Sequence, residues 1–397
     1  MNLDATFGTV KLYAVAIACS ANWGCSASAD SAEKVADTGH QPLCAAEAKH
    51  FASRSYATLG APPAGIAGGR TVVIVGSPLE GRVIALDRRT RREVGSLPPP
   101  PGGFVLPYII RALDESHVAV LDAGGFPSPM PFVPANPRIY EYEYDYDFIR
   151  GLTAKLKRTI SFENELIGFA EDIAPIGHGR YVLSDAALGA LWVVESDGKV
   201  RPGVAPKGLA PEDALFPLAL CSSMPEIFVS GLPFLFSGSA LPGVAALAAN
   251  NGQLYFYSPC GRGLYSIPLP SLFDARQPYE RIVDVKLVSK AADTVAVEQL
   301  LGLSFSPDSK DHHLYAADSL QLRIIRIDLV NGTREIIADE PTLFDFPSST
   351  AFLPQPGAAP ILLVASNQQE RTTLTNDAIQ QDQLKPPFTI GEVLLRP

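Results

Sequence analysis

Six repeated pairs of short apolar runs predict an all-β protein, a six-bladed β-propeller with four-stranded blades. In each pair a β-branched and aromatic run ends in a small polar residue, and a second such run follows a few residues later. The intervals between these residues are 45, 63, 73, 60 and 48; the residues are Ser77, Asp122, Asp185, Ser258, Asp318 and Ser366. Repeats of this length are typical of propeller blades, whereas a β-sandwich has no reason to repeat in this way.

Each pair is preceded by an apolar run that we expect to form the innermost strand of a blade, beside the central channel. These runs are AGIAG, PYIIRALD, EDIAPI, VAALAA, LLGLSFS and STAFLP. Charged runs after four of the pairs are predicted outer strands, because exposed sheet edges carry charge; they are REVGSLP, KRTISF, RIVDVKLV and REIIADE.

The last unit ends at the C-terminus, so its fourth strand is expected from HFASRSYATL near the N-terminus, which would close the ring. Helical periodicity is confined to GLTAKLKR and DAIQQDQLK, and both are expected between blades. The 35 prolines and 32 glycines of the 397-residue chain lie between apolar runs, as in a turn-rich β-protein.

A net charge of −10 argues against nucleic acid or an anionic membrane as the partner, because phosphate binding needs clustered lysines and arginines. The one basic cluster, residues 88–92, is expected at a solvated hairpin tip. Residues 1–29 are a predicted signal peptide, with Lys11, an apolar stretch and Ala27-Ser28-Ala29 before Asp30. The stretch is too short for a membrane anchor, and a lipoprotein signal at Cys19 is the weaker alternative. Residues 30–397 are then one exported propeller domain, in an extracellular, periplasmic or secretory compartment.

Cleavage leaves three of the five cysteines, Cys44, Cys221 and Cys260. In an oxidising compartment we expect a disulfide between Cys221 and Cys260, which would pin the insertion leading into the fourth blade; the alternative is three free, buried thiols. Asn331, in Asn-Gly-Thr on a turn, is a glycosylation acceptor if the host is a eukaryote.

Polar residues at the starts of inner strands and at the ends of second strands are expected to meet on one face of the channel. The candidate catalytic residues are Glu171, Asp172 and Glu298, because converging carboxylates can differ in pKa and so divide acid and base roles. Such carboxylates can also hold a divalent cation, and calcium is the candidate. The candidate substrate-binding residues on this face are Tyr108, Asp122, Asp185, Asp318 and Ser348. The alternative for any single aspartate is a turn cap.

Two long apolar insertions, residues 124–137 and about 203–242, are expected to wall a pocket for an apolar small molecule, with Phe132 and Phe234 in contact with it. The alternatives are packing on the propeller rim or a homodimer contact. Motifs of serine hydrolases, zinc proteases and phosphate-binding loops do not occur. His178, in the turn GHGR, is expected to be an ordinary loop histidine.

Residues 300–329, LLGLSFSPDSKDHHLYAADSLQLRIIRIDL, resemble the propellers of the gluconolactonase and senescence-marker type, and EDIAPIGHGRYVLSDAALGALWVVESDG is a weaker match, also similar to strictosidine-synthase-like blades. The resemblance implies a single calcium or zinc ion in the channel, held by a Glu, an Asn and an Asp, with an Asp as base. Leu301 stands at the Asn position, and Phe346-Pro347-Ser348-Ser349 replaces the Asp-Gly pair, so two of these ligands are not matched. Glu171 has the blade position of Leu301 in an earlier unit, which makes it the candidate ligand of a relocated site.

Three functions follow. The favoured one is an exported enzyme of specialised metabolism that binds an apolar substrate and uses carboxylates for cyclisation, isomerisation or hydrolysis, with no cofactor expected. The second is a metal-dependent lactonase or esterase of the gluconolactonase type. The third is a non-catalytic propeller that binds a ligand or a protein.

Overall fold

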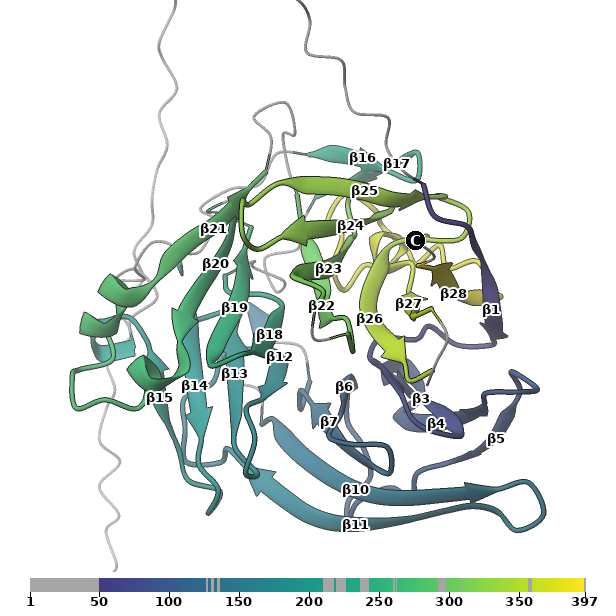
Figure 1. Cartoon of the computed structure of the whole chain (residues 1–397), viewed down its shortest axis with the longest axis horizontal. Coiled ribbons are helices and arrows are strands. Elements are labelled where there is room, and N and C mark those ends of the chain that lie inside the picture. The colour runs from purple at the N-terminus through teal and green to yellow at the C-terminus, as the bar shows by residue number, and fades with distance from the viewer. Residues whose placement is uncertain are drawn as a thin grey trace, which may run out of the picture. The chain divides into compact units, whose positions relative to one another are not determined.

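The computed structural model describes residues 50–125, 128–129, 132–133, 136–209, 218, 226–235, 243–259, 261, 263–291, 298–308, 310–355 and 359–395. Its strands form six four-stranded antiparallel sheets around a central channel, which confirms the predicted six-bladed propeller (Figure 1). Among the described residues, no helix is long and apolar enough to cross a membrane.

The first three blades follow one another along the chain, and each is built from its inner strand to its outer strand. Blade 1 is β2 (Ile66–Gly68), β3 (Val72–Ser77), β4 (Arg82–Asp87) and β5 (Glu93–Ser96). Blade 2 is β6 (Pro107–Ala112), β7 (His117–Asp122), β10 (Arg138–Asp147) and β11 (Gly151–Ser161). Blade 3 is β12 (Ala170–Pro175), β13 (Tyr181–Asp185), β14 (Ala190–Val194) and β15 (Val200–Val204).

The last three blades complete the ring. Blade 4 is β18 (Leu247–Asn250), β19 (Gln253–Ser258), β20 (Gly263–Pro268) and β21 (Lys286–Lys290). Blade 5 is β22 (Leu300–Phe305), β23 (His313–Asp318), β24 (Arg323–Asp328) and β25 (Arg334–Asp339). Blade 6 is β26 (Pro347–Leu353), β27 (Ile361–Ser366), β28 (Phe388–Leu394) and the N-terminal β1 (Ser53–Leu59), so the two ends of the described chain close the ring as predicted.

Short elements connect the blades. Two small hairpins lie outside them, β8 (Ser128–Pro129) with β9 (Phe132–Val133), and β16 (Ile227–Val229) with β17 (Leu232–Phe234). The 3-10 helices are η1 (Pro78–Glu80), η2 (Lys207–Leu209), η4 (Leu269–Leu272), η5 (Glu280–Asp284) and η6 (Gln369–Arg371).

The predicted register is confirmed, because the second strand of every blade ends at the small polar residue aligned from the sequence. Three local predictions are wrong. GLTAKLKR is not helical but part of β11, where Leu152, Ala154 and Leu156 alternate with polar residues and pack on the core, which is strand periodicity. DAIQQDQLK forms no helix, and RIVDVKLV is a strand only from Lys286, since η5 takes its first half.

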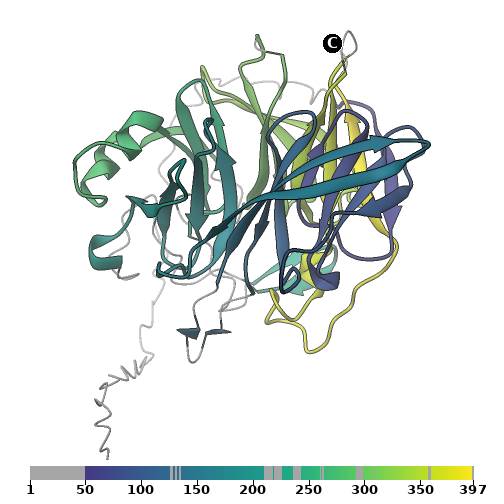
Figure 2. The same ribbon diagram turned by 90° about the horizontal axis from the view of Figure 1, so that it is seen from below.

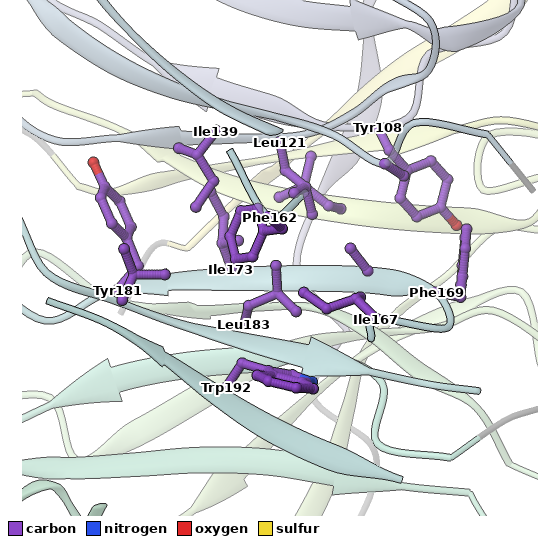
Figure 3. Close-up of a cluster of buried hydrophobic side chains, with 14 of the residues drawn as sticks. Tyr108, Leu121, Ile139, Phe162, Ile167, Phe169, Ile173, Tyr181, Leu183 and Trp192 are labelled. Atoms are coloured by element: carbon purple, nitrogen blue, oxygen red, sulfur yellow. The ribbon is translucent and has the colours of Figure 1, made fainter. Parts of the chain in front are cut away.

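Neighbouring blades pack through the alternating apolar faces of their strands. Between blades 2 and 3, Ile139, Phe162, Leu183 and Trp192 are buried in one cluster (Figure 3). Burial of each such side chain contributes roughly 1.5–3 kcal/mol. The stability of the propeller therefore resides largely between its blades.

The inner strands of adjacent blades contact one another all around the channel. One close approach is at Gly302 of β22, whose φ is 58°; a Cβ atom there would lie 2.5 Å from Cα of Ser349 in β26. Because no other residue tolerates both the conformation and the contact, a glycine is required where blades 5 and 6 meet.

Candidate active site

β-Bulges turn selected side chains of the inner strands into the channel. In β6, Pro107 pairs with Asp122 and Ile109 with Leu121, so Tyr108 is the extra residue between them. The same shift leaves Glu171 unpaired in β12 and Ser348 unpaired in β26. A bulge re-aims the side chain of its extra residue, and these three therefore face the channel from three blades.

The three bulged residues line a small cavity inside the channel, which we call the central cavity. It has a volume of about 10 Å³, about the space that one water molecule needs, and receives residues from all six blades; they are Ala64, Tyr108, Ile109, Glu171, Asp172, Ala246, Leu301, Gly302 and Ser348. Tyr108, Glu171, Asp172 and Ser348 are its polar side chains. The sequence-predicted residues Tyr108, Glu171 and Ser348 are thus brought together.

Glu171 and Tyr108 form the pair with the most unusual protonation. The Tyr108 hydroxyl is hydrogen-bonded to the Glu171 carboxyl and also to the side chain of Gln369. Burial, followed by the negative charge of Asp172, raises the pKa of Glu171 to about 8, although the Tyr108 hydrogen bond opposes this shift. Burial and the nearby Glu171 raise the pKa of Tyr108 well above its usual value. At neutral pH both groups therefore carry a proton that they can donate.

A second hollow, the Tyr108 pocket, lies next to the central cavity and shares Tyr108 with it. It is a shallow hollow with a volume of about 40 Å³, and its lining is mostly apolar with a few polar groups; the residues are Pro62, Pro78, Leu79, Leu106, Tyr108, Asn367, Gln369, Thr372, Leu374 and Thr375. Apolar walls with a few convergent polar groups are typical of small-molecule sites.

One wall of the Tyr108 pocket is an insertion that sequence analysis missed, residues 367–387 between β27 and β28. Figure 2 shows this segment in yellow, extending beyond one end of the blades. Asn376 holds it in place, since its side chain donates to the carbonyls of Pro233 and Glu370 and accepts the N–H of Leu235. The length of the connection in the sequence was the signal. Residues 367–387 separate β27 from β28 along the chain, whereas only η1 and Gly81 separate β3 from β4.

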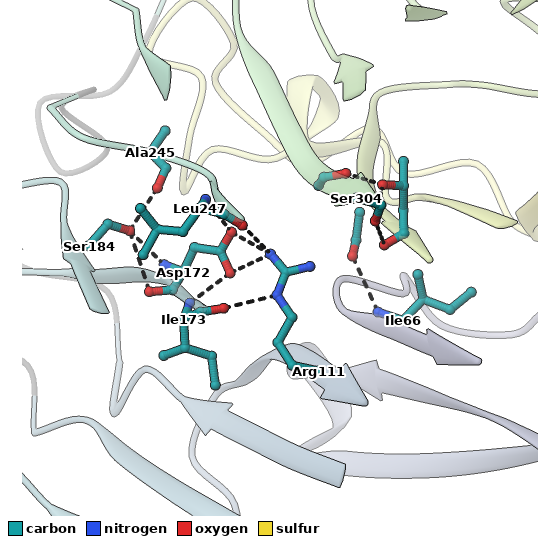
Figure 4. Close-up of polar contacts among 11 residues, drawn as sticks. Ile66, Arg111, Asp172, Ile173, Ser184, Ala245, Leu247 and Ser304 are labelled. Carbon is teal, nitrogen blue, oxygen red and sulfur yellow. Dashed lines mark hydrogen bonds and ion pairs between the residues drawn. The ribbon is translucent and has the colours of Figure 1, made fainter. Parts of the chain in front are cut away.

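Asp172, beside Glu171 in the sequence, is an ion-paired residue (Figure 4). Its two carboxylate oxygens lie 2.6 and 2.5 Å from Nη2 of Arg111 and accept the N–H groups of Leu247 at 2.8 Å and Ile173 at 2.7 Å. The pair is buried and links blade 2 to blades 3 and 4. With its oxygens occupied in this way, Asp172 has the contacts of a structural carboxylate.

Glu298 lies in a different cluster and lines neither hollow. Nη1 of Arg334 contacts both of its oxygens, at 2.6 and 2.5 Å, and the Tyr257 hydroxyl donates to it at 3.0 Å. Asp318 accepts a 2.9 Å bond from Nε of Arg323, and burial, followed by the charge of Glu298, raises the pKa of Asp318 to about 7. The structure does not bring these two carboxylates together with Glu171.

Asp122 and Asp185 have the turn-capping contacts that we weighed as the alternative. Asp122 accepts the N–H groups of Val105, Leu106 and Gly124. Asp185 likewise accepts four backbone N–H groups; their donors are Gly168, Phe169, Ala187 and Leu188. Each aspartate ties the end of a second strand to the loop that enters its blade.

The remaining predicted residues lie away from the two hollows or outside the described part of the chain. Phe234 is buried in β17 and packs on Phe346, with ring centroids 5.9 Å apart, so it lines neither hollow. Asn331 is exposed in the turn between β24 and β25, as expected, and its side chain bonds to Asp328 and Thr333. The side chain of Phe132, the cysteines Cys44, Cys221 and Cys260, and residues 1–29 lie outside the described residues.

The residues around Glu171 do not fit the metal site that the family resemblance implies. Leu301 lines the central cavity at the expected Asn position, and Asp172 is taken by Arg111. Calcium binds six to eight oxygens, and in the part of the chain that the structure describes no three acidic, histidine or cysteine side chains form a metal-binding group. The described residues around Glu171 therefore do not support a metal-dependent mechanism.

The sequence matches no protein-family model and no curated protein. Several solved structures are similar. The Malassezia sympodialis allergen Mala s 1 has a TM-score of 0.52 at 12% identity, covering 85% of this chain and 92% of its own. A luciferin-regenerating enzyme has a TM-score of 0.50 at 12% identity, and the match covers 87% of this chain and 95% of that enzyme. Regucalcin, a calcium-binding protein from Agrobacterium tumefaciens, has 0.47 at 14% identity, covering 87% and 94%. At such identities the likeness shows the fold alone. The chain is thus a six-bladed β-propeller that shares its fold with these proteins.

Proposed function

We propose that this chain is an exported small-molecule enzyme of specialised metabolism, in which an apolar substrate docks at the Tyr108 pocket and its reacting end reaches Glu171 in the central cavity, where it receives a proton. The observation that carries the proposal is the Tyr108–Glu171 pair: Glu171 lines the central cavity, and Tyr108 lines both that cavity and the apolar pocket. A buried acid that keeps its proton near neutral pH is suited to general acid catalysis.

The roles follow from the partners of each group. Glu171 gives its proton to a carbonyl oxygen, an ether oxygen or an alkene carbon of the substrate, and it takes a proton back at the end of the turnover. Tyr108 stays protonated and orients the acceptor by a hydrogen bond. Gln369 of the 367–387 segment, bonded to Tyr108, holds that hydroxyl in position. Cyclisation, isomerisation and hydrolysis all begin with such a proton transfer, so the pair is compatible with each of them.

The second candidate, a metal-dependent lactonase, has less support. Regucalcin is named as a calcium-binding protein, but Glu171 is the one cavity carboxylate without an arginine partner among the described residues. Elemental analysis of the purified protein separates the two candidates, since a stoichiometric metal would favour the lactonase. Export is proposed from the N-terminal residues alone; intact-mass analysis of exported protein should show a chain that begins near Asp30.

A paired activity screen tests the acid–base proposal. Wild type, Glu171→Gln and Glu163→Gln are incubated with apolar lactones, esters and enones, and products are identified by mass spectrometry. Glu163 is an exposed carboxylate, so its variant is the matched control. Turnover that is lost only in Glu171→Gln supports the proposal. Equal turnover by all three proteins contradicts it.

A further inference from the structure

The channel has a second mouth at the other ends of the same inner strands. Tyr108 lies at the start of β6, whereas Arg111 and Ala112 lie at its end, about 13 Å away at the usual rise per residue. At this second mouth the ends of β6, β12, β18 and β22 and the turns that follow β6 and β12 surround a funnel of about 730 Å³. We call it the Arg180 funnel.

The Arg111–Asp172 pair separates this funnel from the central cavity. Arg111 lines the funnel, Asp172 lines the cavity, and Leu247 bonds to both, as Figure 4 shows. A molecule in the funnel is therefore held apart from Glu171. The funnel is a separate site and does not depend on the proposed function.

Most charged groups around the funnel are neutralised by a neighbour. Lys157 pairs with Glu143 at 2.9 Å, and Asp114 contacts Nδ1 of His117 at 2.8 Å, which is an ion pair only when the imidazole is protonated. Glu141 is taken by Arg158 at 3.1 Å and by the Tyr181 hydroxyl at 2.9 Å. These ion pairs cancel much of the field that would otherwise repel or attract a ligand.

Arg180 is the exception. Among the described residues its guanidinium has no carboxylate partner, and its buried Nε atom makes no hydrogen bond. The group lies over the ring of Phe273, 5.1 Å from the centroid, which holds its plane in place. The positive charge has no counter-ion among the described residues, and an anionic oxygen on its terminal nitrogens would supply one.

The same funnel offers apolar surface from Leu113 and Phe305, whereas Leu247 and Leu303 in its wall are buried. Phe305 is held by an edge contact with Tyr255, with centroids 5.4 Å apart. One unpaired cation above an apolar floor matches a molecule with a single negative charge and a hydrocarbon body. We propose that the Arg180 funnel binds an organic carboxylate, with its carboxylate on Arg180 and its hydrocarbon part against Leu113 and Phe305.

Titration of the full chain with octanoate, hexanoate and octylammonium, followed by calorimetry, tests this site. The variant is Arg180→Gln. The matched control is Arg201→Gln, because Arg201 also lies over Phe273, at 5.3 Å, but is paired with Glu195 and does not line the funnel. We expect octanoate to bind more tightly than hexanoate, Arg180→Gln to weaken octanoate binding at least about tenfold, and Arg201→Gln to bind as wild type does.

Three results would overturn the proposal: no octanoate binding at millimolar concentration, equal binding by Arg180→Gln, or equal binding of octylammonium. A Glu171→Gln protein that binds octanoate normally would support the separation of the two sites. Melting temperatures of all variants show whether any loss of binding is a loss of folded protein.

Discussion

Glu171 and Asp172 are adjacent carboxylates in one strand, yet their surroundings assign them different roles. Asp172 contacts Arg111 and two backbone N–H groups and links three blades. Glu171, turned into the channel by a bulge, contacts the Tyr108 hydroxyl and keeps a raised pKa. Burial raises the pKa of both carboxyls, but Arg111 stabilises the charged form of Asp172, whereas Tyr108 is the smallest of the three effects on Glu171. The comparison teaches that burial alone does not indicate a catalytic acid, because the partner decides how far the charged form is stabilised.

The largest effect is expected at the ion pair. Asp172→Asn should lower the free energy of unfolding by about 3–5 kcal/mol, because it leaves the buried Arg111 guanidinium without its counter-ion. Denaturant unfolding measures this loss, with the exposed Asp197→Asn as the control. If Asp172→Asn is as stable as wild type, Asp172 is not a structural counter-ion, and the contrast drawn between Asp172 and Glu171 is wrong.

Loss of the acid should affect turnover instead. Glu171→Gln should reduce kcat on the native substrate by about 10²–10⁴-fold, the usual contribution of a general acid, and leave the unfolding free energy unchanged or higher. It should not fall, because a neutral amide removes a buried carboxyl next to Asp172. Kinetics and unfolding are measured on one preparation; an unfolded variant would show that Glu171 is structural.

The pH dependence of the unfolding free energy should differ between wild type and Glu171→Gln. Because the pKa of Glu171 is raised from 4.5 to about 8 by folding, the folded state binds its proton more tightly than the unfolded state. Stability should therefore fall between about pH 4.5 and 8, by up to about 1.4 kcal/mol per pH unit, and this fall should be absent in Glu171→Gln. Other buried groups titrate in both proteins and cancel in the difference. If the stability of wild type and of Glu171→Gln changes with pH in the same way, folding does not raise the pKa of Glu171.

Tyr108→Phe should have the smallest effect, about tenfold on kcat, because it removes one orienting hydrogen bond and leaves the proton donor. The phenyl ring still fills the space between the two hollows, so KM should change less than kcat. Steady-state kinetics on the same substrate provide both values. If Tyr108→Phe loses as much kcat as Glu171→Gln does, Tyr108 and not Glu171 is the proton donor.

The structure brings some of the sequence-predicted polar residues into one cavity and leaves the others elsewhere, and their catalytic and binding roles stay predictions. Tyr108, Glu171 and Ser348 lie in the central cavity as expected, since strand alignment alone puts them at equivalent blade positions. Asp122 and Asp185 cap backbone N–H groups, and Glu298 is bound by Arg334. No local pattern indicates that Arg334 is the partner of Glu298.

The amino-acid sequence by itself determined the strands, their register and the closing of the ring, because alternation of apolar and polar side chains is a property of neighbours in the chain. The ends of all six second strands follow from that alternation. Only the tertiary structure decided which carboxylate meets a cation, since Arg111 and Asp172 come from different blades and meet only when those blades pack. It also decided that residues 367–387 wall the Tyr108 pocket, because that segment is held by side-chain contacts with a distant hairpin and not by a repeating pattern of its own.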